Sequence, residues 1–189
     1  MTIDTAFTHF PSLTTNRLVL RQIQPIDAEA LFATFSDEEA MQFYGHEPHH
    51  SLEDTLTLIQ QIQARYDRRA AIRWGITLKG KDTIIGSCGF HHFGDGFHHA
   101  ETGYELHRAY WRQGIMFEAM SAILTLGFTE LELHRIEAII DIANEQSKGL
   151  LLKLGFTYEG NLRQRFFFRD QFEDEHFFGL LKHEWHGSV

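Results

Sequence analysis

The stretch YELHRAYWRQGIMFEAM, from Tyr104 to Met120, predicts a strand that crosses a polar turn and becomes a helix. Tyr104 and Leu106 suit the pleated surface of a sheet. Beyond the turn, apolar residues recur at helical spacing, so one face of a helix that begins near Ile115 is expected to be buried. The residues of this face are Ile115, Met120, Ile123, Leu124 and Phe128.

The turn between this strand and this helix indicates a binding site for a phosphate. The first amides of a helix have no carbonyl partners within the helix, and the helix dipole makes that end locally positive. Gly114 has no side chain that would block a close approach. The expected phosphate-binding residues are Arg112, Gln113, Gly114, Ile115, Met116 and Phe117. The alternative is an ordinary strand-to-helix connection, because short glycine motifs often occur without a ligand.

Composition limits the class of protein. A chain of 189 residues fits one domain with a substantial core, and we expect it to span residues 13–189 after a flexible leader at residues 1–12. The net charge of −9 argues against a nucleic-acid partner. No apolar run reaches the length of a membrane span, which argues against a membrane partner. The single cysteine, Cys88, excludes an internal disulfide and favours the reducing cytoplasm.

The remaining patterns predict a mixed α/β protein. A first strand near Leu18 ends before Pro25, which opens a helix through Phe35, and residues 36–50 are expected to be irregular. Ser51 is expected to cap a second helix whose inner face carries Leu52, Leu56, Ile59, Ile62 and Tyr66. Further strands are expected at 74–78, 83–90, 100–106 and 135–141, a helix after Asn144, and a closing hairpin at 158–168 and 173–181.

Several motifs occur in an order typical of one family. They are Thr15–Arg21, Ile85–Phe90, Ala100–Tyr104, Tyr110–Gly114, Phe117–Ala119, Asn144–Ser147 and Lys153–Phe156. In these motifs the chain resembles the GNAT superfamily of acyl-CoA-dependent N-acyltransferases, in particular the RimJ/RimL-type branch of ribosomal-protein N-terminal acetyltransferases. The resemblance implies a single mixed, largely antiparallel twisted sheet of about seven strands, flanked by about four helices and splayed at its central strands.

The resemblance also implies acetyl-CoA as the acetyl donor. Its pyrophosphate would lie at the glycine turn, and its pantetheine arm would lie like an added strand along the backbone of Glu105, Leu106 and His107. Asn144 and Ser147 match the polar residues that face this arm, although both suit plain helix capping as well. The turn departs from the family's usual motif at Trp111 and Met116. The first two predicted helices and their connection would wall the acceptor pocket.

Glu101 is the candidate general base. An alkyl ammonium has a pKa of about 10, so a carboxylate acting directly or through water would have to remove its proton. Glu101, Gly103 and Glu105 share one face of the predicted strand, and the resemblance places Glu101 near the acceptor. A solvated edge carboxylate is the alternative, with Glu105 as a less favoured base. The backbone N–H of Leu106 is the candidate oxyanion donor.

The departing thiolate lacks its usual partner. Many members of the superfamily carry a tyrosine seven residues after the asparagine as a proton donor, and this chain has Leu151 there. Either Ser147 or a water takes that role, or no acid is needed, because a thiolate is a tolerable leaving group near neutral pH. Ser147 is therefore, with Glu101, a candidate catalytic residue.

Histidine pairs at His91-His92 and His98-His99 raise the question of a metal. Neighbouring residues on a strand point to opposite faces, so at most one of each pair should bind, and no cysteine or carboxylate completes a usual set. We therefore expect no metal. Cys88 is expected in the core. The run Phe166–Phe168, with Phe177 and Phe178, is expected to be core or a dimer face, which leaves a monomer or a homodimer.

These patterns predict an acetyl-CoA-dependent N-acetyltransferase that acts by direct transfer to a primary amine. By branch resemblance, the favoured acceptor is the N-terminal α-amine of a protein or peptide. A small amine, an amino acid or an antibiotic is the alternative acceptor. A different class is a non-catalytic acyl-CoA-binding module. Glu101 favours catalysis, whereas the missing tyrosine favours binding alone.

Overall fold

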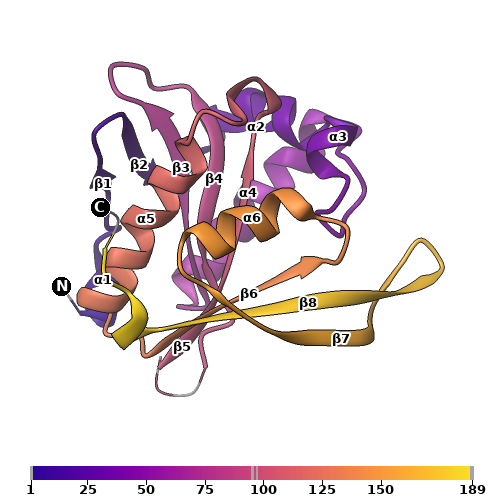
Figure 1. Ribbon diagram of the computed structural model, residues 1–189. Coiled ribbons are helices and arrows are strands. Elements are labelled where there is room, and N and C mark those ends of the chain that lie inside the picture. The colour runs from indigo at the N-terminus through magenta and orange to yellow at the C-terminus, as the bar shows by residue number, and fades with distance from the viewer. Residues whose placement is uncertain (1, 95, 97, 188–189) are drawn as a thin grey trace.

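One eight-stranded sheet, in the order β1-β2-β3-β4-β5-β6-β8-β7, organises the computed structural model, which describes residues 2–94, 96 and 98–187 (Figure 1). The strands are β1 Leu13–Thr14, β2 Leu18–Gln22, β3 Ala71–Leu78, β4 Ile84–His91, β5 His99–Leu106, β6 Arg135–Asp141, β7 Thr157–Phe168 and β8 Gln171–Leu181. Neighbouring strands are antiparallel except β5 and β6, which are parallel. The predicted mixed, largely antiparallel sheet is confirmed.

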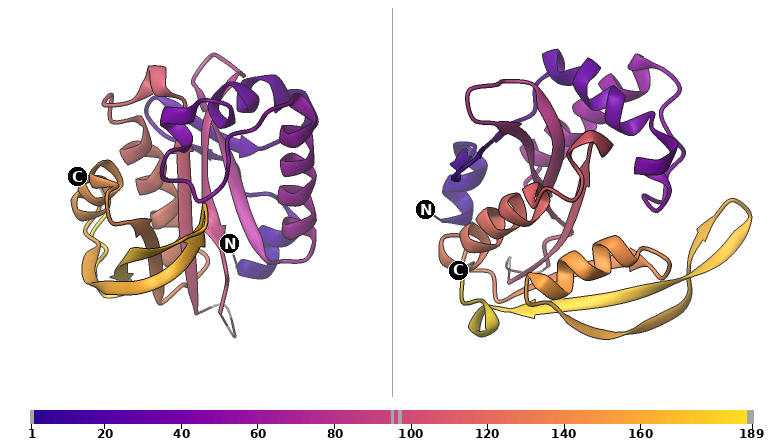
Figure 2. Two further views of the ribbon diagram at one scale, coloured as in Figure 1. Left: turned by 90° about the vertical axis from the view of Figure 1, so that its right-hand side faces the viewer. Right: turned by 45° about the horizontal axis from the view of Figure 1, so that its top comes forward.

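Six α-helices are present in the described residues: α1 Ile3–Thr8, α2 Ala28–Phe35, α3 Glu38–Met41, α4 Leu52–Asp67, α5 Ile115–Thr129 and α6 Glu145–Lys153. In Figure 2, α4 and α5 lie on opposite sides of the sheet. The short α3 falls in the segment that was expected to be irregular. Within the described ranges, no helix combines the length and apolar character needed to cross a bilayer.

The predicted caps fix where helices begin. The Ser51 hydroxyl accepts from the Asp54 amide at 3.3 Å, and the Asp54 carboxylate accepts from the Ser51 amide at 2.8 Å, so α4 begins with a capping box. The expectation that Leu52 lies on the buried inner face of α4 is wrong. Leu52 is 39 % exposed, because the first turn of the helix projects beyond the sheet-facing stripe that includes the buried Ile59.

The leader is not loose in the described part of residues 1–12. Ala6 in α1 is fully buried, and the Tyr66 hydroxyl donates to its carbonyl at 2.7 Å. Pro11 offers its carbonyl to the indole N–H of the buried Trp74 at 2.6 Å. The expectation fails because the helical period brings the apolar residues of this segment to one side, where they pack on the main core.

The parting of β5 and β6 creates the site. Their pairing is confined to His99↔Arg135, Ala100↔Ile136 and Glu101↔Glu137. Beyond Glu101 the two strands continue without pairing to each other in the described chain, and Figure 1 shows them diverging. β6 instead stays paired with β8 as far as Asp141. This geometry confirms the predicted splay and leaves one edge of β5 open.

Candidate active site

A cavity of about 670 Å³ lies where β5 and β6 separate. The end of β4, the middle of β5, the end of β6 and the start of α6 line it, and the segment after α3 and the β7–β8 hairpin form two of its walls. Residues of three predicted motifs line it together, among them Glu101, Tyr104, Asn144 and Ser147. The fold therefore brings the candidate base and the candidate thiolate partner to one cavity from separate parts of the chain.

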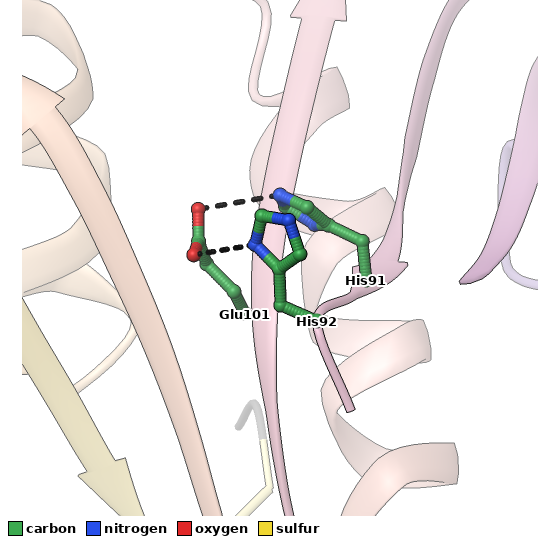
Figure 3. A group of neighbouring side chains, drawn as sticks. All are labelled: His91, His92 and Glu101. Carbon is green, nitrogen blue, oxygen red and sulfur yellow. Dashed lines mark hydrogen bonds and ion pairs between the residues drawn. The ribbon is translucent and has the colours of Figure 1, made fainter. Parts of the chain in front are cut away.

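Two histidines hold the Glu101 carboxylate (Figure 3). Its oxygens lie 3.2 Å from His91 Nε2 and 3.1 Å from His92 Nδ1. Burial alone raises the pKa of the Glu101 carboxyl, but the hydrogen bonds and charges of the two histidines outweigh burial and lower the pKa to about 2. Glu101 is therefore ionised at physiological pH, and it is not the freely solvated edge carboxylate of the alternative reading.

The positions of His91 and His92 differ from the geometry expected of neighbouring residues on a strand. His92 follows the last residue of β4 and has a φ of 48°, which departs from strand geometry, so its ring lies beside that of His91 with centroids 4.6 Å apart. Glu101 supplies the carboxylate that was expected to be missing. The donor atoms of the three side chains lie within 4.8 Å of one another, a spacing that a cation could share. The geometric argument against a metal is therefore wrong. That no metal binds stays a prediction.

Glu105 is committed to a buried network on the same face of β5. Its carboxylate pairs with the Arg73 guanidinium and accepts from the Ser87 hydroxyl, and the Tyr44 hydroxyl lies 3.3 Å from it. Arg73 also donates to Ser87 at 2.6 Å. Burial, and then the charge of Glu105, raise the pKa of Tyr44. These contacts make Glu105 poorly placed to take a substrate proton.

The glycine turn is built by backbone geometry and by one arginine. Gly114 has a φ of 72° and forms the N-cap of α5, with no side-chain cap bond from the residues described. Arg17 donates to the Gln113 carbonyl at 3.0 Å and to Glu118 at 2.6 Å, which fixes the turn against β2. Arg112 is exposed and also has a positive φ, of 58°. The turn thus presents the start of α5 to solvent, as a phosphate site requires.

Helix α6 connects this turn to the cavity. At its end, the Lys153 ammonium lies 4.6 Å from the centre of the Phe117 ring, in the first turn of α5. At its start, Asn144 and Ser147 line the cavity. The Asn144 side chain accepts from the Ser147 amide at 3.0 Å, so the predicted capping role of Asn144 is confirmed. Arg17 and Lys153 were not singled out from the sequence.

The open edge of β5 presents the Leu106 amide toward the gap. The His107 amide donates to the Ile85 carbonyl of β4 at 2.8 Å. Successive amides of a strand point to opposite edges, so the Leu106 N–H points away from β4, toward the gap left by β6. The Leu106 carbonyl accepts from the Trp111 indole at 2.7 Å, which gives this unorthodox motif residue a structural role.

A salt bridge joins the two walls of the cavity. Arg169, in the turn of the β7–β8 hairpin, donates to both carboxylate oxygens of Glu47 at 2.8 and 2.7 Å. Phe166 lies against Gly45, where an added Cβ would come within 3.0 Å of the ring. The hairpin and the segment after α3 therefore meet across the mouth of the cavity, where an acceptor would enter.

A sheet splayed beside a glycine turn at a helix start, with an ionised carboxylate in the gap, defines an acyltransferase of the acyl-CoA-dependent class. Residues 17–157 match the acetyltransferase (GNAT) domain family. The chain belongs to this family, and it is an acetyl-CoA-dependent N-acetyltransferase.

Similar proteins include both uncharacterised and named enzymes. An uncharacterized N-acetyltransferase, YoaA of Bacillus subtilis, is 41 % identical over 92 % of this chain and 98 % of its own length. The [ribosomal protein uS5]-alanine N-acetyltransferase of Escherichia coli is 26 % identical over 92 % of each chain. A crystal structure of a GNAT-family acetyltransferase from Bacillus anthracis has a TM-score of 0.84 at 26 % identity and covers 92 % of this chain and 100 % of that one.

Proposed function

We propose that this enzyme transfers the acetyl group of acetyl-CoA directly to the N-terminal α-amine of a protein or peptide. The observation that carries the proposal is that the ionised Glu101 and the start of α6 line one cavity, at the point where β5 and β6 separate. The carboxylate attracts the acceptor's ammonium, and the open edge of β5 accepts the donor. The two substrates then meet in the gap.

Residues on the donor side bind and orient acetyl-CoA. The amides of residues 113–117, with Arg112, hold the pyrophosphate at the start of α5. The backbone of Glu105, Leu106 and His107 supports the pantetheine arm as a strand-like partner, and Asn144 and Ser147 flank that arm. The Leu106 N–H, directed into the gap, stabilises the oxyanion that forms when the amine attacks the thioester carbonyl.

Residues on the acceptor side remove the amine's proton. A carboxyl group with a pKa of about 2 holds a proton weakly. Glu101 therefore does not keep the amine's proton: it takes the proton directly or through a water and passes it on to solvent, while His91 and His92 hold the carboxylate in place. Ser147 hydrogen-bonds the departing sulfur from the other side of the cavity.

The choice of a protein or peptide terminus rests on relatedness and on charge. The E. coli relative is, by its name, an N-acetyltransferase of an alanine of ribosomal protein uS5. The lining of this cavity carries Glu101, Asp141, Glu173, Asp174 and Glu175 together with Arg65, Arg73, Arg165 and Arg169. The ionised Glu101, held by two histidines and not by an arginine, is the carboxylate that suits a cationic amine. We further propose that the enzyme works in the cytoplasm as a monomer or homodimer, and that no metal, nucleic acid or membrane takes part.

A substrate panel tests the proposal. Thiol release from acetyl-CoA is measured with peptides that begin with Ala or Ser, with the same peptides blocked at the N-terminus, and with polyamines, amino acids and aminoglycosides. We expect release with the free peptides alone, and mass spectrometry should place the acetyl group on the α-amine. If a small amine gives faster thiol release than the peptides, the small amine and not a peptide terminus is the acceptor. Tight acetyl-CoA binding without transfer to any amine would contradict catalysis.

A further inference from the structure

The Tyr104 hydroxyl is a buried polar group without a protein partner. Four side-chain atoms in the described residues share this property: Thr34 Oγ1, Tyr104 OH, His176 Nδ1 and Trp185 Nε1. Of these four residues, Tyr104 alone lines the cavity. Buried hydroxyls in proteins are almost always hydrogen-bonded, so an orphan hydroxyl inside a substrate cavity indicates a partner that arrives with the substrate.

Ser147 is the polar neighbour of this hydroxyl. Burial raises the pKa of Tyr104 to about 12, and the nearby Ser147 side chain lowers this pKa in part. The two hydroxyls nevertheless do not meet the geometry of a hydrogen bond. The Asn144 side-chain oxygen accepts from the Ser147 amide at 3.0 Å, and the Tyr104 hydroxyl makes no hydrogen bond to it. The free phenol O–H therefore lies beside the start of α6, next to the residue assigned to the departing sulfur.

Helix α6 has no hydroxyl of its own in the place where the family usually has a tyrosine. Leu151 occupies that place and is fully buried in the core. Tyr104 comes from β5 instead and reaches the same cavity from the opposite side of the gap. A phenol is therefore present beside the start of α6, although it belongs to a different element of the fold.

We propose that Tyr104 is a catalytic residue that donates a hydrogen bond to the sulfur of acetyl-CoA as the thiolate leaves, together with Ser147. This inference rests on the proposed acetyl transfer. It explains why the hydroxyl is retained at a buried position where it has no protein partner and where phenylalanine would fill the same space.

The chemistry requires donation of a hydrogen bond without transfer of the proton. When the tetrahedral intermediate collapses, the carbon–sulfur bond breaks and its electron pair moves to sulfur. A thiol has an ordinary pKa of about 8.5, well below the phenol's, so the Tyr104 proton stays on oxygen while its hydrogen bond stabilises the growing charge. The thiolate takes its proton from solvent, and the proton of the attacking amine leaves on the Glu101 side.

Tyr104→Phe removes the hydroxyl and keeps the ring. We expect kcat to fall by about tenfold to a hundredfold. This is somewhat less than the fall that follows loss of one preorganised oxyanion donor. The affinity for acetyl-CoA, measured by calorimetry, should change little. The melting temperature should stay equal or rise, because a buried unsatisfied hydroxyl is lost. Tyr158→Phe, on β7 and outside the cavity lining, is the matched control and should leave kcat unchanged.

Titration of the CoA thiol in its enzyme complex gives a readout that a packing role would not move. The ultraviolet absorbance of the thiolate reports its pKa. A donor aimed at sulfur stabilises the thiolate, so the thiol bound to the wild-type enzyme should titrate about one pH unit lower than the thiol bound to Tyr104→Phe. Ser147→Ala keeps Tyr104, and its complex should retain part of this lowering.

The outcomes separate this inference from the proposed function. If the wild type transfers acetyl groups while Tyr104→Phe matches it in both kcat and bound-thiol pKa, the role of Tyr104 is refuted and the function stands. If no amine is acetylated, the proposed function fails, and the thiol titration still tests Tyr104. If Tyr104→Phe does not fold, a bound-thiol pKa in Ser147→Ala equal to that of free CoA overturns the inference, and a lowered one supports it.

Discussion

Glu101 and His91 are cross-strand partners on β5 and β4, and their side chains meet at 3.2 Å inside the cavity. His92 reaches the other carboxylate oxygen only because the backbone leaves strand geometry after β4. Glu101 therefore acts within a group of three ionisable side chains. A base within such a group can pass a proton on, so its weak intrinsic basicity does not prevent turnover.

Glu101→Gln keeps the size of the side chain and removes its charge and basicity. We expect kcat to fall by roughly a hundredfold, the usual scale for one general base, with acetyl-CoA affinity nearly unchanged. The rate of the variant should recover in part at alkaline pH, where free amine is plentiful. Steady-state rates across pH, with an acceptor from the panel, measure this. Glu132→Gln, an exposed carboxylate outside the cavity lining, is the control, and an unchanged rate in Glu101→Gln would remove Glu101 from the mechanism.

The lowered pKa of Glu101 also predicts an acid dependence of stability. Its folded value of about 2 lies below the ordinary 4.5, so the folded state binds this proton less tightly than the unfolded state does. The stabilisation is therefore fully present above pH 4.5 and is lost as pH falls toward 2. Urea unfolding of the wild type and of Glu101→Gln at several pH values measures it.

The difference in unfolding free energy between these two proteins should be largest at neutral pH and should shrink below pH 4.5. A difference that stays constant down to pH 3 would show that the two histidines do not lower the pKa of Glu101 as the contacts indicate.

The metal question is decided by direct measurement. We expect elemental analysis of protein purified without a histidine tag to find no stoichiometric transition metal, and we expect a chelator to leave activity unchanged. Two of the three neighbouring donors already share hydrogen bonds with the third, which satisfies the group without an ion. One tightly held zinc per chain would reverse this expectation, and its loss in Glu101→Gln would place it in the group.

Local patterns predicted the elements that carry their own signals. The strand from Arg135 to Asp141 was predicted with its observed bounds, because β-branched isoleucines are concentrated in this short run. A hairpin between strands at 158–168 and 173–181 was also predicted. The turn is tighter than expected, because β8 begins at Gln171 and only Arg169 and Asp170, both with positive φ, form the two-residue turn. Capping residues likewise fixed the starts of α4 and α6.

Features that depend on tertiary contacts were not predictable in this way. Helix α1 is stabilised by packing against Tyr66, far along the chain: the Tyr66 hydroxyl donates to the Ala6 carbonyl, and its ring lies against Phe7. The Arg73–Glu105 pair joins two strands whose register is a property of the whole sheet. A charged residue inside the apolar strand around Trp74 was the one available signal for it.

The glycine turn can be tested with an unusually well-matched control. Gly114 and Gly80 both have a left-handed backbone, with φ of 72° and 78°, so valine imposes similar strain at either position. A Cβ at Gly80 meets no described atom within 4 Å, and one at Gly114 meets only Arg17 Nη2, at 3.5 Å. Gly80 lies in the β3–β4 turn, outside the proposed acetyl-CoA site.

Gly114→Val should therefore weaken acetyl-CoA binding by tenfold or more, or about 1.4 kcal/mol, because its side chain enters the space in which the pyrophosphate would approach the amides of α5. Gly80→Val should lose similar stability and bind acetyl-CoA like the wild type. Titration calorimetry measures the affinities, and urea unfolding measures the strain that both variants share. Equal affinities in the two variants would mean that the pyrophosphate binds elsewhere. A loss of affinity confined to Gly114→Val, with equal loss of stability in the two variants, would support binding of the pyrophosphate at this turn.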